Sequence, residues 1–294
     1  MKIDSDVLAE FNSLNRRLGL KRLLKSIGYE RSAELPYVVN ALRTRFSRPL
    51  RCLDIGTGDS VLPMYLLTQS AWDITCVDKC EWVQVQHQYA RRLALESSTL
   101  KRLHVVEDDL FEYRPSAPFD VIISISVIEH FPRNLDSKAM HYSAEMLRDG
   151  GEYVLTTLVN EGYPREFSRQ GEVYGNREKN GTFYQRHYDV ASLEARLVRP
   201  SGLDEIGRVY FGEYGFPFGE RFIFPRLARN PLKLFYRWLS PYFAERFVTY
   251  SHRPASRHDM SVDTAAGVIL MLKKPDKSAP GREQAASVAA VSRA

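Results

Sequence analysis

The sequence has no long apolar run. No segment of its 294 residues approaches the roughly 18 uninterrupted apolar residues that a membrane-spanning helix requires. Its first 28 residues, MKIDSDVLAEFNSLNRRLGLKRLLKSIG, also lack the continuous apolar stretch of a signal peptide. We therefore expect a cytoplasmic protein.

Cysteine is scarce as well. Cys52, Cys76 and Cys80 sit in or beside apolar, strand-like runs, and they form no Cys-x-x-Cys pair. No histidines stand at the spacing that would complete a zinc site. The pattern predicts buried or nearly buried thiols and no metal.

Positive charge is concentrated in one segment. The chain has a net charge of +5, but residues 221–257 hold eight basic residues against one acidic residue, a net +7, so the remainder carries −2. A protein whose basicity is local is not generally coated by polyanions. Nucleic acid is therefore disfavoured as a partner.

The order of apolar patterns predicts an α/β architecture. Apolar residues at helical spacing before residue 47 predict an N-terminal helical cap over residues 1–47. From residue 50, apolar strands alternate with amphipathic helices, which is typical of a doubly wound, mostly parallel sheet. We assign residues 48–274 to this domain and 275–294, which are small, polar and aperiodic, to a disordered tail.

The late part of the chain breaks the alternation. After a helix over residues 188–203, the strands DEIGRVYFGEY and AAGVILMLKKP follow without a full crossover helix between them. Such a pair is expected to be antiparallel, at one edge of the sheet. The basic, aromatic residues 213–260 then form an insertion between the last two strands.

The stretch CLDIGTGDS indicates the ligand. Gly56 and Gly58 follow the first strand, where ligands of doubly wound sheets bind. A dinucleotide site would have a third glycine at Val61, and Asp54 would repel a pyrophosphate. The ammonium and sulfonium groups of S-adenosylmethionine would instead be attracted by Asp54. Asp78 ends the second strand, where a carboxylate can accept hydrogen bonds from ribose hydroxyls.

The third strand ends in EDDL, where a carboxylate can accept from the adenine amino group while the next backbone N–H donates to the ring. We favour Asp109 with Leu110 for these roles and keep Asp108 as the alternative. Thr57, inside the glycine turn, and Lys79, beside Asp78, complete this set of candidates.

Taken together, LDIGTGDS, VDKC, VVEDDL, FDVIISISVIEHF and MLRDGGEYVLTT resemble, in the same order, the motifs of class I S-adenosylmethionine-dependent methyltransferases. The resemblance covers residues 50–158 and, more loosely, the late strands. It implies a seven-stranded sheet with an antiparallel last strand, and it implies that Ser126 and Val127 lie near the methionine or adenine portion of the cofactor. Ser60 departs from the family, because many members have a third glycine there.

Two histidines are candidates for a catalytic base. His130 follows the fourth strand in SVIEHF, beside Glu129, which we interpret as a helix-entry or cofactor-shell residue. His187 lies in TFYQRHYD, just before a helix. Either histidine could take a proton from an acceptor hydroxyl, and either could be purely structural. The aperiodic residues 161–182 between them predict a mobile loop over the cofactor.

The basic insertion leaves the acceptor open. Its aromatics could pack on the sheet edge as a lid, its arginines could hold an anionic substrate such as a phosphorylated sugar, or residues 221–257 could contact a membrane surface. We predict O-methylation of a small-molecule or glycan-type acceptor. The alternatives are an RNA or protein methyltransferase and a non-catalytic cofactor-binding subunit. The absence of an Asn-Pro-Pro-Tyr-like or Asp-Pro-Pro-Tyr-like motif at SVIEHF counts against methylation of amino nitrogens of bases.

Overall fold

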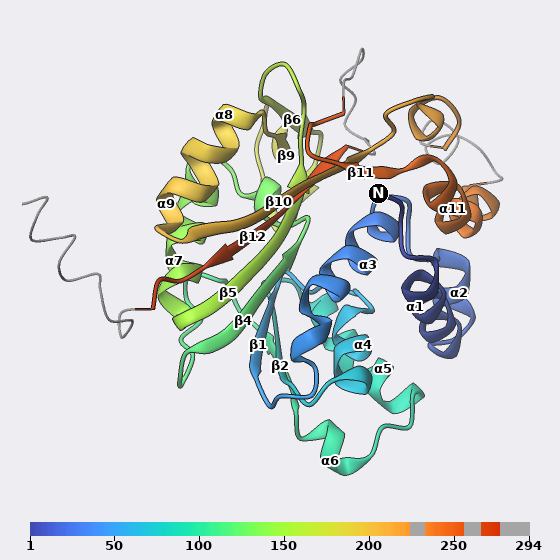
Figure 1. Ribbon diagram of the computed structural model, residues 1–294, viewed down its shortest axis with the longest axis vertical. Helices are drawn as coiled ribbons and strands as arrows, with labels where there is room; N and C mark the ends of the chain where they lie inside the picture. Colours follow the sequence, from blue (N-terminus) through green and yellow to red (C-terminus); the bar gives the residue numbers. More distant parts are fainter. Residues whose placement is uncertain (224–232, 256–265, 277–294) are drawn as a thin grey trace, which may run out of the picture.

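A computed structural model describes residues 1–223, 233–255 and 266–276 (Figure 1). Its centre is an eight-stranded sheet of order β11-β10-β12-β5-β4-β1-β2-β3. The strands are β1 (Arg51–Ile55), β2 (Asp73–Asp78), β3 (Leu103–Glu107), β4 (Phe119–Ile125), β5 (Leu147–Leu158), β10 (Asp204–Gly212), β11 (Thr249–Ser251) and β12 (Gly267–Lys273).

The sheet confirms the predicted doubly wound, mostly parallel arrangement. The five strands β1 to β5 pair in parallel, whereas β12 runs antiparallel to both β5 and β10. The expected antiparallel pair of late strands is therefore present. The expected number of seven strands is one too low, because the three-residue β11 inside the insertion pairs with β10 and extends the edge.

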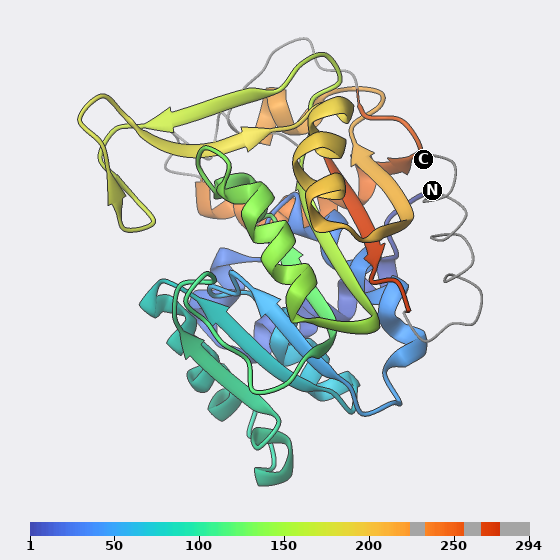
Figure 2. The same cartoon turned by 90° about the vertical axis from the view of Figure 1, so that its left-hand side faces the viewer.

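Helices cover both faces of the sheet. Neighbouring strand residues such as Cys52 and Leu53 point to opposite faces, and each packs into a separate apolar cluster. The second cluster is covered by α7 (Leu135–Met146), α8 (Val190–Leu193) and α9 (Arg199–Ser201), as Figure 2 shows. The first is covered by α1 (Ser5–Arg17), α3 (Arg31–Leu42), α4 (Leu62–Gln69), α5 (Val85–Arg92) and α11 (Lys233–Phe247). Helix α2 (Leu20–Lys25) packs against α1 and α11. Because both faces are buried, the strands are almost continuously apolar.

The N-terminal segment forms the helices that its periodicity predicts. Asp4 caps α1 by accepting hydrogen bonds from the backbone N–H groups of Asp6 and Val7, each at 3.1 Å. Phe11 of α1 stacks on Tyr65 of α4 with ring centroids 4.3 Å apart. The N-terminal helices thus share one apolar core with the sheet.

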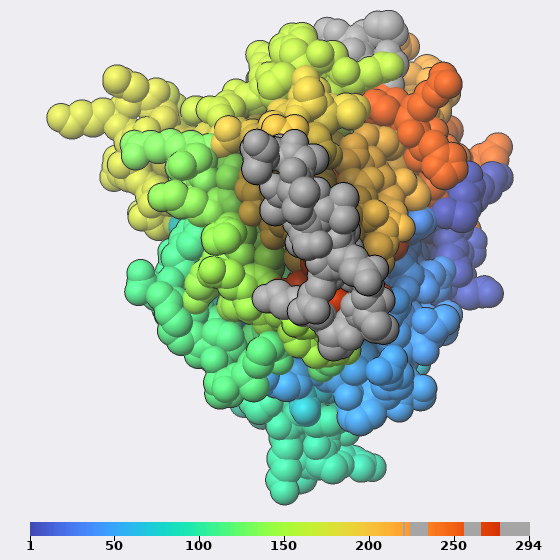
Figure 3. Space-filling view, turned by 60° about the vertical axis from the view of Figure 1, so that its left-hand side comes forward, coloured from blue at the N-terminus to red at the C-terminus, as the bar shows by residue number. Residues whose placement is uncertain are grey.

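The segment predicted as a mobile loop is instead built of paired strands. β6 (Arg165–Arg169) pairs with β9 (Thr182–His187), and between them β7 (Glu172–Val173) pairs with β8 (Asn176–Arg177). Figures 2 and 3 show this hairpin projecting from the body of the molecule. Most residues of β6 are exposed on both faces, so no apolar alternation marked it in the sequence.

The cysteine prediction is confirmed. Cys52 and Cys76 are buried free thiols and Cys80 is half-buried.

The short helix α6 (Ser97–Leu100) leads into β3. Across residues 1–223, 233–255 and 266–276, no helix is long and apolar enough to cross a membrane. Nearly all of the predicted tail lies outside the described residues.

Candidate functional site

A cavity of about 540 Å³ opens at the carboxyl ends of β1, β2 and β4. The chain runs outward from β1 to β3 and then returns to the other side of β1 as β4, so this edge is the switch point of the sheet, where ligands of such folds bind. The structure brings all eleven predicted cofactor residues to this cavity: Asp54, Gly56, Thr57, Gly58, Asp78, Lys79, Asp108, Asp109, Leu110, Ser126 and Val127.

The turn after β1 requires glycine because its backbone is left-handed at two positions and because Val127 lies close to one of them. Gly56 has φ +64°, and a Cβ added to it would lie 2.5 Å from Cγ1 of Val127, which follows β4. Gly58 has φ +53°, and its N–H donates to Oδ2 of Asp78 at 2.9 Å. Ser60, the departure from the family motif, accepts a hydrogen bond from Leu62 N–H at 3.2 Å and so supports the start of α4.

Asp54 is the residue that best fits a cationic ligand. It is 2% exposed, and its Oδ2 atom is buried with no hydrogen-bond partner within the described parts of the chain. Burial raises the pKa of Asp54 to about 7, with Asp78 contributing a smaller repulsion. An ammonium or sulfonium group in the cavity would supply the missing partner.

The other carboxylates of the cavity are held by backbone N–H groups. Asp78 accepts from Gly58 at Oδ2 and from Cys80 at Oδ1, both at 2.9 Å, and each oxygen keeps a lone pair for a ligand hydroxyl. Asp109 accepts from Phe111 N–H at 2.9 Å, while Asp108 accepts from Asp109 N–H at 2.9 Å. Both remain candidates for the adenine contact.

The N-terminal helices complete one wall of the cavity. Arg22 and Lys25 of α2 form ion pairs with Asp59 in the glycine loop, the former at 3.2 Å. Arg31 of α3 donates to Ser126 Oγ at 2.6 Å, and its side chain remains 36% exposed. Ser126 in turn donates to the fully buried Glu34 at 2.7 Å. These contacts fix the α2–α3 segment against both strand ends.

His130 lines the cavity and has a defined tautomer. Its Nδ1 lies 2.6 Å from the carbonyl oxygen of Tyr184, so Nδ1 carries the proton and donates. Nε2 is then the basic nitrogen, 3.5 Å from the hydroxyl of Tyr174. Burial lowers the pKa of His130 to about 4, so the imidazole is neutral at pH 7.

Glu129, beside His130, is a buried shell residue. It is fully buried and accepts a hydrogen bond from Thr157 at 3.1 Å, and burial raises its pKa to about 8. It does not line the cavity within the described residues, which agrees with the shell interpretation and not with a base.

His187 lies elsewhere. It is fully buried at the end of β9, its ring packs on Phe167 with centroids 4.6 Å apart, and its Nε2 is 2.8 Å from Nε2 of Gln185. It is not among the described residues that line the cavity. The geometry therefore assigns it to the base of the hairpin, and a catalytic role has no support from its position.

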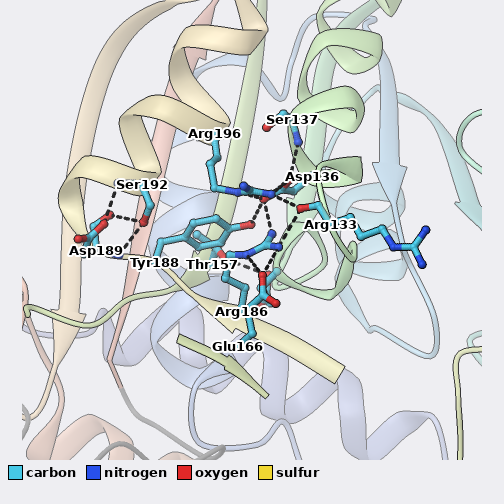
Figure 4. Close-up of polar contacts among 11 residues, drawn as sticks. Arg133, Asp136, Ser137, Thr157, Glu166, Arg186, Tyr188, Asp189, Ser192 and Arg196 are labelled. Carbon is cyan, nitrogen blue, oxygen red and sulfur yellow. Dashed lines mark hydrogen bonds and ion pairs between the residues drawn. The ribbon is translucent and has the colours of Figure 1, made fainter. Parts of the chain in front are cut away.

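A buried ionic cluster fastens the hairpin to the helices (Figure 4). Asp136 of α7 is fully buried and accepts from Arg186 of β9 at 2.5 Å, from Arg196 at 2.7 and 2.8 Å, and from the Tyr188 hydroxyl at 2.9 Å. Arg186 also pairs with Glu166 of β6 at 2.6 Å. Arg186 of this cluster lies on β9, the same strand as Tyr184, whose carbonyl oxygen accepts a hydrogen bond from His130.

Sequence reasoning missed several residues that line the cavity, among them Arg31, Asp59, Trp82 and Tyr174. Trp82 and Tyr174 are in edge-to-face contact, with centroids 6.0 Å apart. The one available signal was the GTGD turn, since Asp59 directly follows Gly58. Within the described ranges, no group of three or more His, Cys, Asp or Glu side chains is placed to hold a metal ion.

Comparison with known families gives one match over most of this site. A family model described as a methyltransferase domain matches residues 27–199, more than half of the chain and all eleven cofactor candidates. A tRNA U34 carboxymethyltransferase of Mannheimia succiniciproducens is 28% identical over 110 residues, which are 37% of this chain and 33% of that protein. The chain thus matches about a third of this relative's length.

Solved structures share the fold. Coclaurine N-methyltransferase bound to N-methylheliamine and SAH superposes with a TM-score of 0.55 at 12% identity, covering 92% of this chain and 86% of that one. The 1,6-didemethyltoxoflavin-N1-methyltransferase of Burkholderia thailandensis, solved with bound 1,6-didemethyltoxoflavin and S-adenosylhomocysteine, has a TM-score of 0.51 at 14% identity, covering 83% and 80%. At such identities the likeness concerns the architecture alone.

Proposed function

The chain belongs to the methyltransferase-domain family, and from this premise we propose that it methylates an oxygen atom of a small-molecule or glycan-type acceptor that carries negative charge. The protein is an S-adenosylmethionine-dependent methyltransferase. The cofactor supplies an electrophilic methyl group on a sulfonium centre. The chain must hold the cofactor, align the acceptor in line with the methyl group and, for a hydroxyl, remove a proton.

The cavity offers a partner for each part of the cofactor. Asp54 would attract the cationic groups, Asp78 would accept from the ribose hydroxyls, and Asp109 with Leu110 would contact adenine. The α-carboxylate of the cofactor needs a cation, and the partly exposed guanidinium of Arg31 is suited to it. Asp54 carries this assignment, because a buried carboxylate oxygen without a partner is costly unless a cation fills the cavity.

His130 is the observation that favours an oxygen acceptor. Its proton is on the nitrogen that faces the Tyr184 carbonyl, which leaves Nε2 basic on a residue that lines the cavity. A neutral amine acceptor needs no such base before transfer, whereas a hydroxyl does. Burial lowers its pKa to about 4, which keeps the imidazole unprotonated in the neutral range and also makes it a weak base, so its position and not its pKa supports the role.

Among the described residues, the charge near His130 that remains for the acceptor is that of Arg169, because Arg31 already pairs with Glu34 and is assigned to the cofactor carboxylate. Arg31 lines the cavity, and the Arg169 guanidinium lies 3.4 Å from the ring centroid of Tyr184. The positive charges of both lower the pKa of His130, after burial as the main cause, so both act at the ring. An anionic substituent on the acceptor would be attracted to this region.

We expect His130→Asn to lower kcat about 100-fold on a hydroxyl acceptor at saturating cofactor, the lower end of the range for a lost general base. Cofactor affinity should change little, because His130 is not among the side chains that we assign to the cofactor. Steady-state kinetics with calorimetric S-adenosylmethionine titration measure both. His141→Asn on the exposed face of α7 is the control. An unchanged kcat in His130→Asn, or a larger loss of kcat in His187→Asn, would show that His130 is not the general base.

The acceptor class is tested by following the methyl group. S-adenosylmethionine with a tritiated methyl group is incubated with the protein and an extract of cells that lack it, and label is counted in small-molecule, glycan, lipid, RNA and protein fractions. We expect label in the small-molecule or glycan fraction, as an ether stable to mild base.

Label in RNA would favour the second candidate, methylation or a related transfer to a tRNA nucleoside, which the 28% identity to a tRNA U34 carboxymethyltransferase supports over about a third of that relative. Cofactor binding by calorimetry with no label in any fraction would indicate the third possibility, a non-catalytic subunit.

A further inference from the structure

Helix α11 has two aromatic faces, and within the described residues only one of them is packed. On the inner side, Phe243 and Phe247 contact Phe218, with ring centroids 4.9 and 4.3 Å apart, and Ala244 is fully buried. This side packs against Phe218 and against helices α2 and α3. On the outer side, Phe235, Trp238 and Tyr242 are 53%, 50% and 66% exposed.

The outer aromatics form one stripe. Their positions are separated by three and four residues, which places them on the same side of the helix over two turns. The rings of Phe235 and Trp238 are adjacent, with centroids 6.4 Å apart. Three large aromatics in one exposed stripe are more than scattered surface apolar residues and mark an interaction surface.

A second helix continues this surface. Helix α2 contacts α11, and both lie at the right-hand edge of Figure 1. Leu20 and Leu24 of α2 are 70% and 41% exposed. The same short helix supplies Arg22 and Lys25 to the wall of the cofactor cavity. We call the exposed side chains Leu20, Lys21, Leu24, Phe235, Trp238, Tyr242 and Arg246 the α2–α11 face.

The positive charge of this face favours an anionic surface over a second copy of the chain as its binding partner. Lys21 and Arg246 are exposed on this face, and Arg246 follows Tyr242 by four residues on the same side of α11. The single acidic residue in the sequences of the two helices is Glu245, which accepts a hydrogen bond from Ser5 Oγ at 2.6 Å. Two copies of such a face would repel each other, whereas an anionic surface would be attracted.

We propose that the α2–α11 face docks on an anionic lipid bilayer. Trp, Tyr and Phe are the side chains that favour the boundary between headgroups and acyl chains, and Lys and Arg beside them pair with anionic headgroups. The helix lies on the membrane and does not cross it. Because α2 also lines the cofactor cavity, docking sets the methyl-transfer site beside the membrane surface, where an amphiphilic or lipid-linked acceptor would be presented.

The test uses the full chain without cofactor or acceptor, so its outcome is independent of the proposed reaction. Sedimentation is measured with vesicles of phosphatidylcholine alone and with about 30% phosphatidylglycerol added. We expect the chain to bind the anionic vesicles at least about tenfold more tightly. The triple variant Phe235→Ser, Trp238→Ser, Tyr242→Ser should lose about tenfold or more of this affinity, and Lys21→Gln with Arg246→Gln should lose the preference for anionic lipid.

A matched control removes equally exposed apolar residues elsewhere. Tyr163, Val190 and Ile206 are 59%, 45% and 51% exposed, and their triple serine variant should bind vesicles like the unaltered chain. Calorimetry with S-adenosylmethionine confirms that each variant is folded. The proposal is overturned if the unaltered chain ignores anionic vesicles or if the aromatic variant binds them equally well. It is also overturned if that variant instead converts a dimer to a monomer in gel filtration.

Discussion

Replacing Asp54 by asparagine is expected to weaken S-adenosylmethionine binding by about 1.5–3 kcal/mol, roughly 10- to 150-fold, the range for a lost hydrogen bond to a charged group. The amide keeps the shape of the carboxyl group but cannot attract a cation. Asp54 is buried in the wall of the cavity, and its Oδ2 atom has no hydrogen-bond partner among the described groups. Calorimetric titration of both proteins measures the difference.

The same variant should raise the Tm of the free protein at pH 8. Burial raises the pKa of Asp54 to about 7, so the carboxylate ionises less readily in the folded than in the unfolded chain. Above that pKa the ionised group therefore costs stability, and the neutral amide removes the cost. A gain in stability together with a loss of cofactor affinity is the pattern of a group kept for its ligand. A variant that lost both would have a structural role instead.

The pH dependence follows from the same group. The cofactor cation binds the ionised form, so binding lowers the pKa of Asp54 below 7 and releases a proton. Affinity of the unaltered protein should fall as pH drops from 7.5 to 5.5, by about tenfold per unit below 7. Asp54→Asn should flatten this profile, and Asp73→Asn, exposed at the opposite end of β2, should not. A profile that is equally steep in Asp54→Asn would assign the titration to another group.

The parts of the fold and of the site that the sequence predicts are those marked by short local patterns of residues. Apolar strands, the glycine turn after β1 and the carboxylates at successive strand ends are each a short pattern, and parallel strands bring their carboxyl ends to one edge. The sequence alone therefore places Asp54, Gly56 and Asp78 together. It does not contain the backbone reason for Gly56, because the close neighbour Val127 follows another strand.

The missing parts of the site depend on contacts between distant segments. Arg31 meets Ser126 across 95 residues, and Tyr174 meets His130 across 44. No short pattern announces either pair. The hairpin was missed because exposed strands need not alternate, and β11 because three residues are too few for a period. The sequence around His187 allowed either a catalytic or a structural role, and the pattern does not reveal that this histidine is a buried strand end.

The ionic cluster around Asp136 provides the second large effect. Asp136→Ala is expected to lower the free energy of unfolding by about 3–5 kcal/mol, because it leaves the buried guanidinium of Arg186 without its carboxylate partner. Arg196 loses its carboxylate as well. Urea unfolding followed by circular dichroism measures the change. Glu166→Gln, on the half-exposed side of the same arginine, should cost less than about 1 kcal/mol.

Asp136→Ala should also slow methyl transfer, because the ionic cluster supports the hairpin strand that contacts His130. Arg186 is on β9 two residues after Tyr184, whose carbonyl holds the proton-bearing nitrogen of His130. If Asp136→Ala loosens this strand, the imidazole loses the contact that fixes its tautomer, so kcat should fall while cofactor affinity changes by less than about threefold. The glycine-loop residues that we propose as cofactor ligands are not among the described contacts of the cluster. A drop in cofactor affinity as large as the drop in kcat would show that the cluster supports the whole site and not the hairpin alone.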